Sequence, residues 1–377
     1  MSTRISRRQV VSALAVLAIA AGCSKSPEPA GQQRRKTSAS PSSLYQVTVG
    51  GKHGFIDASG TVAIAPQFEE AMGFSGKLAA VKSGGRWGFV DASGTFVLNP
   101  RFDDVSWGFL QGLAAVRVGP RWGLVGETGT FVAEPQFDGI QTFEGERAAV
   151  VVENRWGFID KSGALIIEPQ FSDVSWSLTH GLSAVKEHER WGFIDQRGTM
   201  VIRASFDNAY AFEDGLAAVQ IGSRWGFVDG SGKLAIKAQF DNAYGFRAGL
   251  APVQVKRLWG FINKTGAFVV EPRFDEIGWS SSQDLSAVKA GGQWGFINAA
   301  GELAISPRFE DAARSFDQGL AAAKIDGRWG FVDLTGAFVI AAQFNDAHNF
   351  NDQLARILFR NRWGYVNKTG TVVWLDR

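Results

Sequence analysis

The sequence contains very little cysteine and histidine. Cys23 is the only cysteine among 377 residues, so no disulfide can form within the chain. The four histidines fall in four different segments, without the spacing that metal ligands show; they are His53, His180, His188 and His348. These shortages argue against a metal site and a cysteine nucleophile, and we expect neither a metal nor a cofactor.

The chain beyond residue 43 also lacks an excess of basic residues. Formal net charge is +2, but the first 43 residues hold +6, so the remainder carries −4. A nucleic-acid-binding domain is expected to present a basic surface. The composition therefore argues against nucleic acid as a partner.

No membrane-spanning helix is predicted at the N-terminus, because the apolar run at residues 10–21 is too short. Arginines precede this run, and it ends in Ala20-Ala21-Gly22-Cys23, a pattern typical of a secretory signal peptide. Its end resembles the bacterial lipoprotein signal, which implies a lipid attached to Cys23. Residues 6–11 also resemble a twin-arginine signal, so either export route is open. We predict a signal peptide at 1–22 and a lipid-anchored protein of the bacterial cell envelope, facing the periplasm or the surface.

Residues 23–43 are rich in Ser, Pro, Gln, Lys and Arg, with only Ala among their apolar residues after the cysteine. Such a segment cannot bury enough apolar surface to offset the entropy of ordering. We expect a flexible tether between the lipid and the remainder of the chain.

The remainder, residues 44–377, is a tandem repeat. A Trp-Gly pair returns every 34 or 35 residues, which makes the region one array of about ten similar units. In the first, degenerate unit His53 takes the place of tryptophan. The nine recurring tryptophans are Trp87, Trp122, Trp156, Trp191, Trp225, Trp259, Trp294, Trp329 and Trp363.

Each unit is predicted to be a meander of three short strands. In the second unit these strands cover residues 78–82, 86–91 and 95–98, separated by turns that contain glycine. Proline follows the third strand in several units, for example Pro100, and is expected to end its pairing. Helical repeats have a similar period, but glycines and β-branched runs leave no stretch long enough for an amphipathic helix.

Alternation along the middle strand places Trp87 and Phe89 on the same face. We expect the nine tryptophans to form part of the core, packed between consecutive units. Glycine beside each tryptophan suggests that a neighbouring group packs directly on that strand. Aspartates and arginines also recur in step, such as Asp91, Asp103 and Arg86, and are predicted to cap turns or to pair.

The Trp-Gly signatures, with Phe-Asp and Leu-Ala-Ala-Val segments in register, resemble the WG-repeat family of bacterial proteins over residues 44–377. The resemblance implies an all-β array that is propeller-like or superhelical, and it transfers no catalytic residue. The ends of the chain coincide with unit boundaries, which favours an open or spiral array. In that case His53 and residues 374–377 are candidates for capping the ends.

Three tryptophans depart from the repeat. Trp107, Trp176 and Trp279 lie in loops between units that are one residue longer than most, where other units have phenylalanine. One interpretation is that they fill the phenylalanine position in a shifted register. The other is that they are exposed platforms that bind a sugar, a glycan strand or a partner's side chain.

Three functions are compatible with these observations. The first is a non-catalytic, lipid-anchored scaffold that binds an envelope protein or another ligand, since a repeat array offers extended surface. The second is a carbohydrate- or peptidoglycan-binding module that uses the loop tryptophans. The third is an envelope enzyme, which requires acidic side chains from different units to converge.

Overall fold

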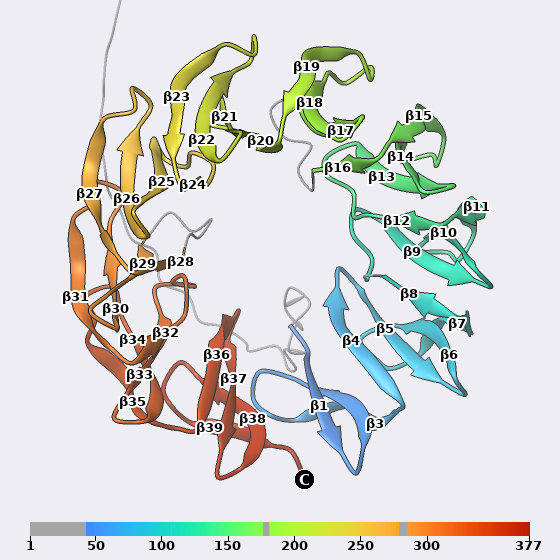
Figure 1. Ribbon diagram of the computed structural model, residues 1–377. Helices are drawn as coiled ribbons and strands as arrows, with labels where there is room; N and C mark the ends of the chain where they lie inside the picture. The colour runs from blue at the N-terminus through green and yellow to red at the C-terminus, as the bar shows by residue number, and fades with distance from the viewer. Residues whose placement is uncertain (1–42, 107, 176–180, 279–284) are drawn as a thin grey trace, which may run out of the picture. The chain divides into compact units, whose positions relative to one another are not determined.

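The repeats form ten small antiparallel sheets arranged in a ring, a ten-bladed β-propeller (Figure 1). The computed structural model describes residues 43–106, 108–175, 181–278 and 285–377. Every regular element in this part of the chain is a strand. It therefore contains no helix long and apolar enough to cross a membrane.

The first sheet has three strands and the second has four. The first consists of β1 (Tyr45–Val49), β2 (Lys52–Ile56) and β3 (Val62–Phe68). The second consists of β4 (Glu70–Ser75), β5 (Leu78–Ser83), β6 (Arg86–Val90) and β7 (Phe96–Phe102). In each four-stranded sheet we call the first strand the inner strand, the third the Trp-Gly strand and the fourth the outer strand.

Sheets three to ten repeat the order of the second sheet. Their inner strands are β8 (Asp104–Val105), β12 (Gly139–Ile140), β16 (Asp173–Val174), β20 (Asn208–Glu213), β24 (Asn242–Ala243), β28 (Glu276–Gly278), β32 (Asp311–Ala312) and β36 (Asp346–Asn351). Their second strands are β9 (Leu113–Val118), β13 (Arg147–Val152), β17 (Ser183–Glu187), β21 (Leu216–Ile221), β25 (Leu250–Val255), β29 (Ser286–Ala290), β33 (Ala321–Ile325) and β37 (Leu354–Phe359).

The other two strands of these sheets carry the Trp-Gly signature and the edge that follows it. The Trp-Gly strands are β10 (Arg121–Gly126), β14 (Arg155–Asp160), β18 (Arg190–Ile194), β22 (Arg224–Asp229), β26 (Leu258–Asn263), β30 (Gln293–Ile297), β34 (Arg328–Val332) and β38 (Arg362–Asn367). The outer strands are β11 (Phe131–Phe137), β15 (Leu165–Phe171), β19 (Met200–Phe206), β23 (Leu234–Phe240), β27 (Phe268–Phe274), β31 (Leu303–Phe309), β35 (Phe338–Phe344) and β39 (Val372–Leu375).

The three predicted strands of each unit are present, joined by the predicted turns. In the second sheet Ser83 pairs with Arg86, and Gly84 and Gly85 between them have φ of 59° and 74°. Residues with positive φ are what a two-residue hairpin turn requires. The hairpin that starts each unit is therefore specified locally by its sequence.

The inner strand is an element that the sequence analysis did not predict. It pairs with the second strand, as where Asp104 and Val105 face Arg117 and Val116. Several inner strands have only two residues, which is too short for an alternating pattern to be recognised. In Figure 1 these strands lie toward the middle of the ring.

The predicted end of the third strand at proline was wrong. The outer strand β7 continues through Pro100 to Phe102, with a register shift between the pairs Phe89–Leu98 and Trp87–Phe102. Proline is tolerated because this strand is the edge of its sheet and is irregular at that point. Phe102 then faces the next sheet and is fully buried.

The core lies between neighbouring sheets. One cluster joins Phe89 and Phe102 of the second sheet to Phe109 and Val116 of the third. The Phe89 and Phe109 rings meet edge to face, with centroids 4.8 Å apart. Equivalent clusters recur from sheet to sheet, so each sheet buries its apolar face only against its neighbours.

The nine tryptophans of the Trp-Gly pairs differ in burial. Trp87, Trp225, Trp259 and Trp294 are buried, with 2–8% of their surface exposed. The other five are partly buried and pack at the margin of the core; they are Trp122, Trp156, Trp191, Trp329 and Trp363. The fully buried aromatic residue of the signature is instead the phenylalanine two positions later, as at Phe89.

The expectation of an open or spiral array was wrong, because the first and last sheets pack together. Tyr45 and Val47 share a cluster with Leu354 of the tenth sheet. Tyr365 donates a hydrogen bond to the carbonyl oxygen of Gln46 at 2.8 Å, and the Thr48 amide donates to Asp376 at 3.1 Å. Sequence spacing could not show this closure, because it depends on the rotation between neighbouring sheets.

The seam also reproduces a contact found at every other junction. In the second to tenth sheets, the turn glycine after the Trp-Gly strand lies against the outer strand of the preceding sheet, as Gly94 lies against Ile64. At the seam Gly60 of the first sheet lies in the same way against Val373 of the tenth. Closure therefore uses the ordinary packing between units, and none of the described strands of the first and tenth sheets is exchanged between them.

Candidate functional site

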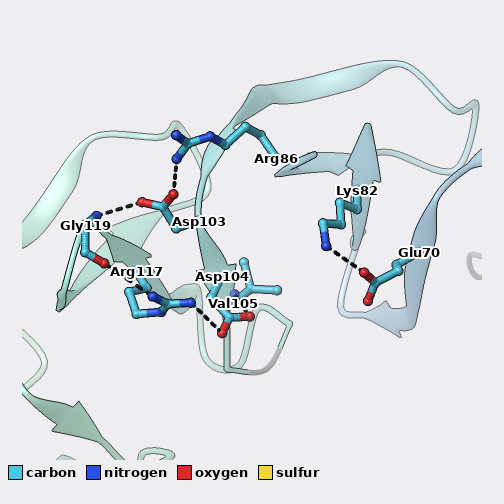
Figure 2. A network of polar contacts seen from close by, with 8 residues as sticks. All are labelled: Glu70, Lys82, Arg86, Asp103, Asp104, Val105, Arg117 and Gly119. Carbon is cyan, nitrogen blue, oxygen red and sulfur yellow. Dashed lines mark hydrogen bonds and ion pairs between the residues drawn. The ribbon is translucent and has the colours of Figure 1, made fainter. Parts of the chain in front are cut away.

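Recurring aspartates and arginines form contacts between neighbouring sheets of the ring. Arg86 of the second sheet pairs with Asp103, whose other carboxylate oxygen accepts a hydrogen bond from the Gly119 amide in the third sheet, at 2.7 Å (Figure 2). The same arrangement recurs for Arg121 with Asp138, Arg190 with Asp207 and Arg224 with Asp241. These predicted pairs are confirmed, and they connect one sheet to the hairpin of the next.

The second set of recurring aspartates caps turns, as predicted. Asp91 accepts hydrogen bonds from the Ser93 hydroxyl at 2.6 Å and from the Ser93 and Thr95 amides at 2.9 and 3.1 Å. These bonds, the Ser93 hydroxyl foremost, lower the pKa of Asp91 below its ordinary value of 3.8. Lowered pKa values recur at the equivalent Asp57, Asp160, Asp195, Asp229 and Asp333.

The residues predicted to bind lipid or ligand lie outside the described part of the chain. They are Cys23, Trp107, Trp176 and Trp279. In the third sheet, the position that phenylalanine occupies in other units is filled by Phe109, which contacts Phe89. This position therefore does not require a tryptophan.

One position on the inner strand varies while its surroundings repeat. The first residue of this strand pairs with a residue of the second strand, and that residue pairs with the tryptophan of the Trp-Gly strand. In the sixth sheet the three residues are Asn208, Gln220 and Trp225. We call the position two residues further along the cover position, since it lies on the same face of the sheet. It is occupied, from the second sheet to the tenth, by Met72, Ser106, Gln141, Ser175, Tyr210, Tyr244, Gly278, Ala313 and His348.

The two tyrosines at cover positions stack on the tryptophan of their sheet. Tyr210 lies over Trp225 with centroids 5.1 Å apart and an interplanar angle of 16°. Tyr244 lies over Trp259 at 5.3 Å and 10°. Both covered indoles are buried, with 6% and 8% of their surface exposed.

A pocket of about 400 Å³ lies on the inner strands of the fifth, sixth and seventh sheets. Its lining includes the partly buried Trp191 with Ser175 at the cover position, together with Tyr210 and Tyr244. The volume falls within the range of about 300–1,000 Å³ typical of small-molecule sites. Aromatic rings from three sheets thus border one cavity.

Charged and polar groups complete this pocket. Glu213 accepts hydrogen bonds from Nε and Nη2 of Arg247, at 3.2 and 3.1 Å, which connects the sixth sheet to the seventh. A β-carbon on Gly245 would overlap Oε2 of Glu213, so a larger residue at that position would displace the carboxylate. Asp173 and Asn208 also line the cavity. Burial raises the pKa of the Tyr210 hydroxyl above its ordinary value of 10.0.

A second pocket, of about 460 Å³, lies beside the seam. Its lining comes from the first two sheets and from Asn351, and includes Tyr45, Phe74, Lys77 and Asp91. Ser43, the first described residue, also lines it, and the residues before Ser43 are not described. The pocket on the fifth to seventh sheets combines aromatic rings from three sheets with the Glu213–Arg247 pair, and we take it as the candidate site.

Titratable residues show no further candidate site within the described ranges. Among those residues, no three His, Cys, Asp or Glu side chains come together as potential metal ligands. The sequence analysis missed the pocket because its residues are ordinary members of the repeat. The sequence does show variation at the cover position. That variation can be related to the tryptophan only when the register of the inner strand is known.

Comparison with solved structures shows the fold. A crystal structure described as that of the eukaryotic initiation factor matches 89% of this chain and 96% of its own, with a TM-score of 0.54 at 14% identity. Kluyveromyces lactis Hsv2p matches over 72% of this chain and 96% of its own, at a TM-score of 0.35 and 12% identity. The dihydro-heme d1 dehydrogenase NirN matches over 80% and 73%, at 0.40 and 13%. At 14% identity, the first of these matches indicates similarity of fold alone.

No curated protein matches the sequence. The model of a family described as the WG containing repeat matches nine consecutive segments: 54–87, 87–119, 122–156, 156–190, 191–225, 225–258, 259–294, 294–329 and 329–363. Each segment runs from the Trp-Gly strand of one sheet, or the equivalent strand of the first, to or close to that of the next, and together the segments span most of the chain. The protein therefore belongs to the WG-containing repeat family.

Proposed function

We propose that this protein is a non-catalytic, lipid-anchored scaffold of a bacterial cell envelope that binds an envelope protein. The observation that supports the scaffold is the cover position, where nine equivalent places on one repeated framework carry seven different kinds of residue. Repeat proteins bind partners through variable positions on a constant framework. The lipid anchor is proposed from the signal sequence that ends at Cys23.

The anchor is tested by labelling cells with a radioactive fatty acid. The protein with Cys23 is expected to take up label and to sediment with membranes, whereas Cys23→Ser removes both properties. Equal labelling of the two forms would contradict the proposal. Residues 44–377 expressed alone serve as the unlabelled control.

The binding face is tested by placing a photo-crosslinking phenylalanine analogue at single positions in cells. We compare the cover positions Ser106 and Ala313 with Val97 and Val339 on outer strands, of which 45% and 53% is exposed. Crosslinks to a discrete envelope protein are expected from the cover positions alone. Equal crosslinking from the outer strands would reject the inner strands as the binding face.

A second candidate function is carbohydrate or peptidoglycan binding, favoured by the aromatic pocket on the fifth to seventh sheets. In the sequence-based form of this hypothesis, Trp107, Trp176 and Trp279 supply the platforms. Its test is sedimentation with purified peptidoglycan. The triple variant with alanine at these three positions is expected to lose retention, and unchanged retention would reject the role of these tryptophans.

A further inference from the structure

We infer that Trp191 and the surrounding pocket form a binding site for one pyranose ring of a sugar. The sugar ring stacks on the Trp191 indole, in the position that the cover tyrosine occupies in the next two sheets. This inference rests on the second candidate function and assigns it to described residues. It uses none of the three loop tryptophans.

The stacking position is defined by the repeat. In the sixth and seventh sheets a tyrosine ring lies parallel to the tryptophan, within 5.1–5.3 Å. The fifth sheet has the same register, with Asp173 facing Lys186 and then Trp191, but Ser175 stands at the cover position. Serine has no ring to stack, and Trp191 is accordingly less buried than Trp225 and lines the pocket.

The chemistry of the walls selects the kind of ring. Sugar hydroxyls both donate and accept hydrogen bonds, and the pocket offers both roles. Carboxylates of Asp173 and Glu213 accept, Arg247 donates, and Asn208 does both. The apolar side of a pyranose packs well on an aromatic face. A single sugar ring can therefore stack on the indole and hydrogen-bond to the polar walls at the same time.

Charge argues against a phosphorylated ligand. Asp173 and Glu213 contribute two negative charges to the lining and Arg247 contributes one positive charge, which leaves one net negative charge. Arg247 is also engaged by Glu213, through two hydrogen bonds. A nucleotide would bring its phosphates to an acidic wall, whereas a neutral sugar meets no such repulsion.

The eighth and tenth sheets do not provide the same site. In the eighth sheet the cover position is Gly278, but Arg314 lies over the Trp294 ring at 3.7 Å and the indole is buried. In the tenth sheet His348 meets Trp363 edge to face at 5.5 Å. The open indole beside two tyrosines is therefore a property of the fifth sheet and its neighbours.

The decisive variant is Ser175→Tyr, which restores the cover residue of the sixth and seventh sheets. We titrate residues 44–377 with cellobiose, maltose and N,N′-diacetylchitobiose, following tryptophan fluorescence and calorimetric heat. The unaltered protein is expected to bind at least one of them with a dissociation constant in the millimolar range or below. Ser175→Tyr is expected to weaken that binding tenfold or more without lowering the unfolding midpoint.

Ser106→Tyr is the matched control, because it makes the same change at the cover position of the third sheet, outside this pocket. It is expected to leave sugar binding unchanged. Trp191→Ala is expected to lose binding as Ser175→Tyr does. Equal affinities of the Ser175→Tyr and Ser106→Tyr proteins, or failure of all three sugars to bind, would overturn the assignment.

Two further outcomes separate this inference from the proposed functions. Binding of choline chloride in place of the sugars would identify a cation site and reject the pyranose. Retention on peptidoglycan that Ser175→Tyr leaves intact would reject the Trp191 site and keep the carbohydrate-binding function. Loss of envelope crosslinking, by contrast, bears on the scaffold alone.

Discussion

Glycine follows tryptophan in this repeat because the outer strand approaches closely at that point. A β-carbon on Gly88 would lie 2.6 Å from the carbonyl oxygen of Leu98 and 2.8 Å from the nitrogen of Pro100. The same contact recurs at the other Trp-Gly glycines in the nine matched segments. The sequence analysis inferred a close neighbour from this pair, and the structure identifies it as the outer strand of the same sheet.

Gly88→Ala is therefore expected to destabilise the protein by about 1–3 kcal/mol, since the backbone must shift to admit the methyl group. The free energy of unfolding is measured by urea denaturation. Gly230→Ala is the control, because nothing lies within 4 Å of its β-carbon position and the equivalent residue of the second sheet is Ala92. Equal losses at the two positions would refute the role assigned to the close contact.

The turn aspartates make stability dependent on pH. Hydrogen bonds in the folded state lower their pKa below the ordinary value of 3.8, so the ionised form is favoured by folding. The stabilisation is fully present above the unfolded-state pKa. It is lost as pH falls through the lower, folded-state pKa.

Asparagine at these positions is expected to keep the turns while removing this dependence. Asn263 shows that the amide oxygen accepts the same bonds, from Thr265 and Ala267. With Asp91, Asp160 and Asp229 changed to Asn, the unfolding midpoint should fall less steeply between about pH 5 and pH 2. Thermal unfolding across this range measures the slope, and a slope equal to that of the unaltered protein would contradict the expectation.

At the scale of the element, ion pairs differ in what they connect. Lys82 and Glu70 lie within one sheet, whereas Arg86 and Asp103 lead to the Gly119 amide of the next sheet (Figure 2). Both pairs are largely exposed, which limits the energy that either contributes. The second pair has an additional hydrogen bond from the backbone, so its loss affects the contact between sheets.

Asp103→Ala is expected to cost about 1 kcal/mol of unfolding free energy, through the loss of the Arg86 pair and the bond from Gly119. Glu70→Ala should cost about 0.5 kcal/mol or less. Urea denaturation measures both, and hydrogen exchange at the β9–β10 turn shows where the contact weakens. If exchange at that turn is faster in Glu70→Ala but not in Asp103→Ala, the assignment of Asp103 to the contact between sheets is wrong.

At the scale of the molecule, the seam decides whether the array has ends. Tyr45 and Tyr365 pack with centroids 5.6 Å apart, and burial raises the pKa of both hydroxyls. Of the residues considered as caps for open ends, Trp374, Asp376 and Arg377 lie at this seam, whereas His53 contacts Gln46 and Thr48 within the first sheet. The Trp374 indole donates to Asp376, which also accepts from the Thr48 amide.

Tyr365→Phe is expected to cost about 1 kcal/mol, because it removes the hydrogen bond to Gln46 and keeps the ring contact. Hydrogen exchange should quicken in β1 and β38 and stay unchanged in β20. Tyr210→Phe, far from the seam in sequence, should leave exchange in β1 unaltered. If Tyr365→Phe leaves the exchange rates of β1 and β38 the same as in the unaltered protein, this hydrogen bond does not hold the ring closed.

Local information in the sequence determined the period, the hairpins, the turn caps and the all-β class, because each depends on residues close together in the chain. Tertiary structure alone decided the inner strand, the closed ring and the pocket. The inner strand β8 has only two residues, too few for a recognisable pattern, so the pairing of Asp104 with Arg117 is seen only in the structure. The rotation between successive sheets brings Tyr45 to Tyr365. Trp191 belongs to a pocket for the same reason, since its walls come from three sheets that only packing brings together.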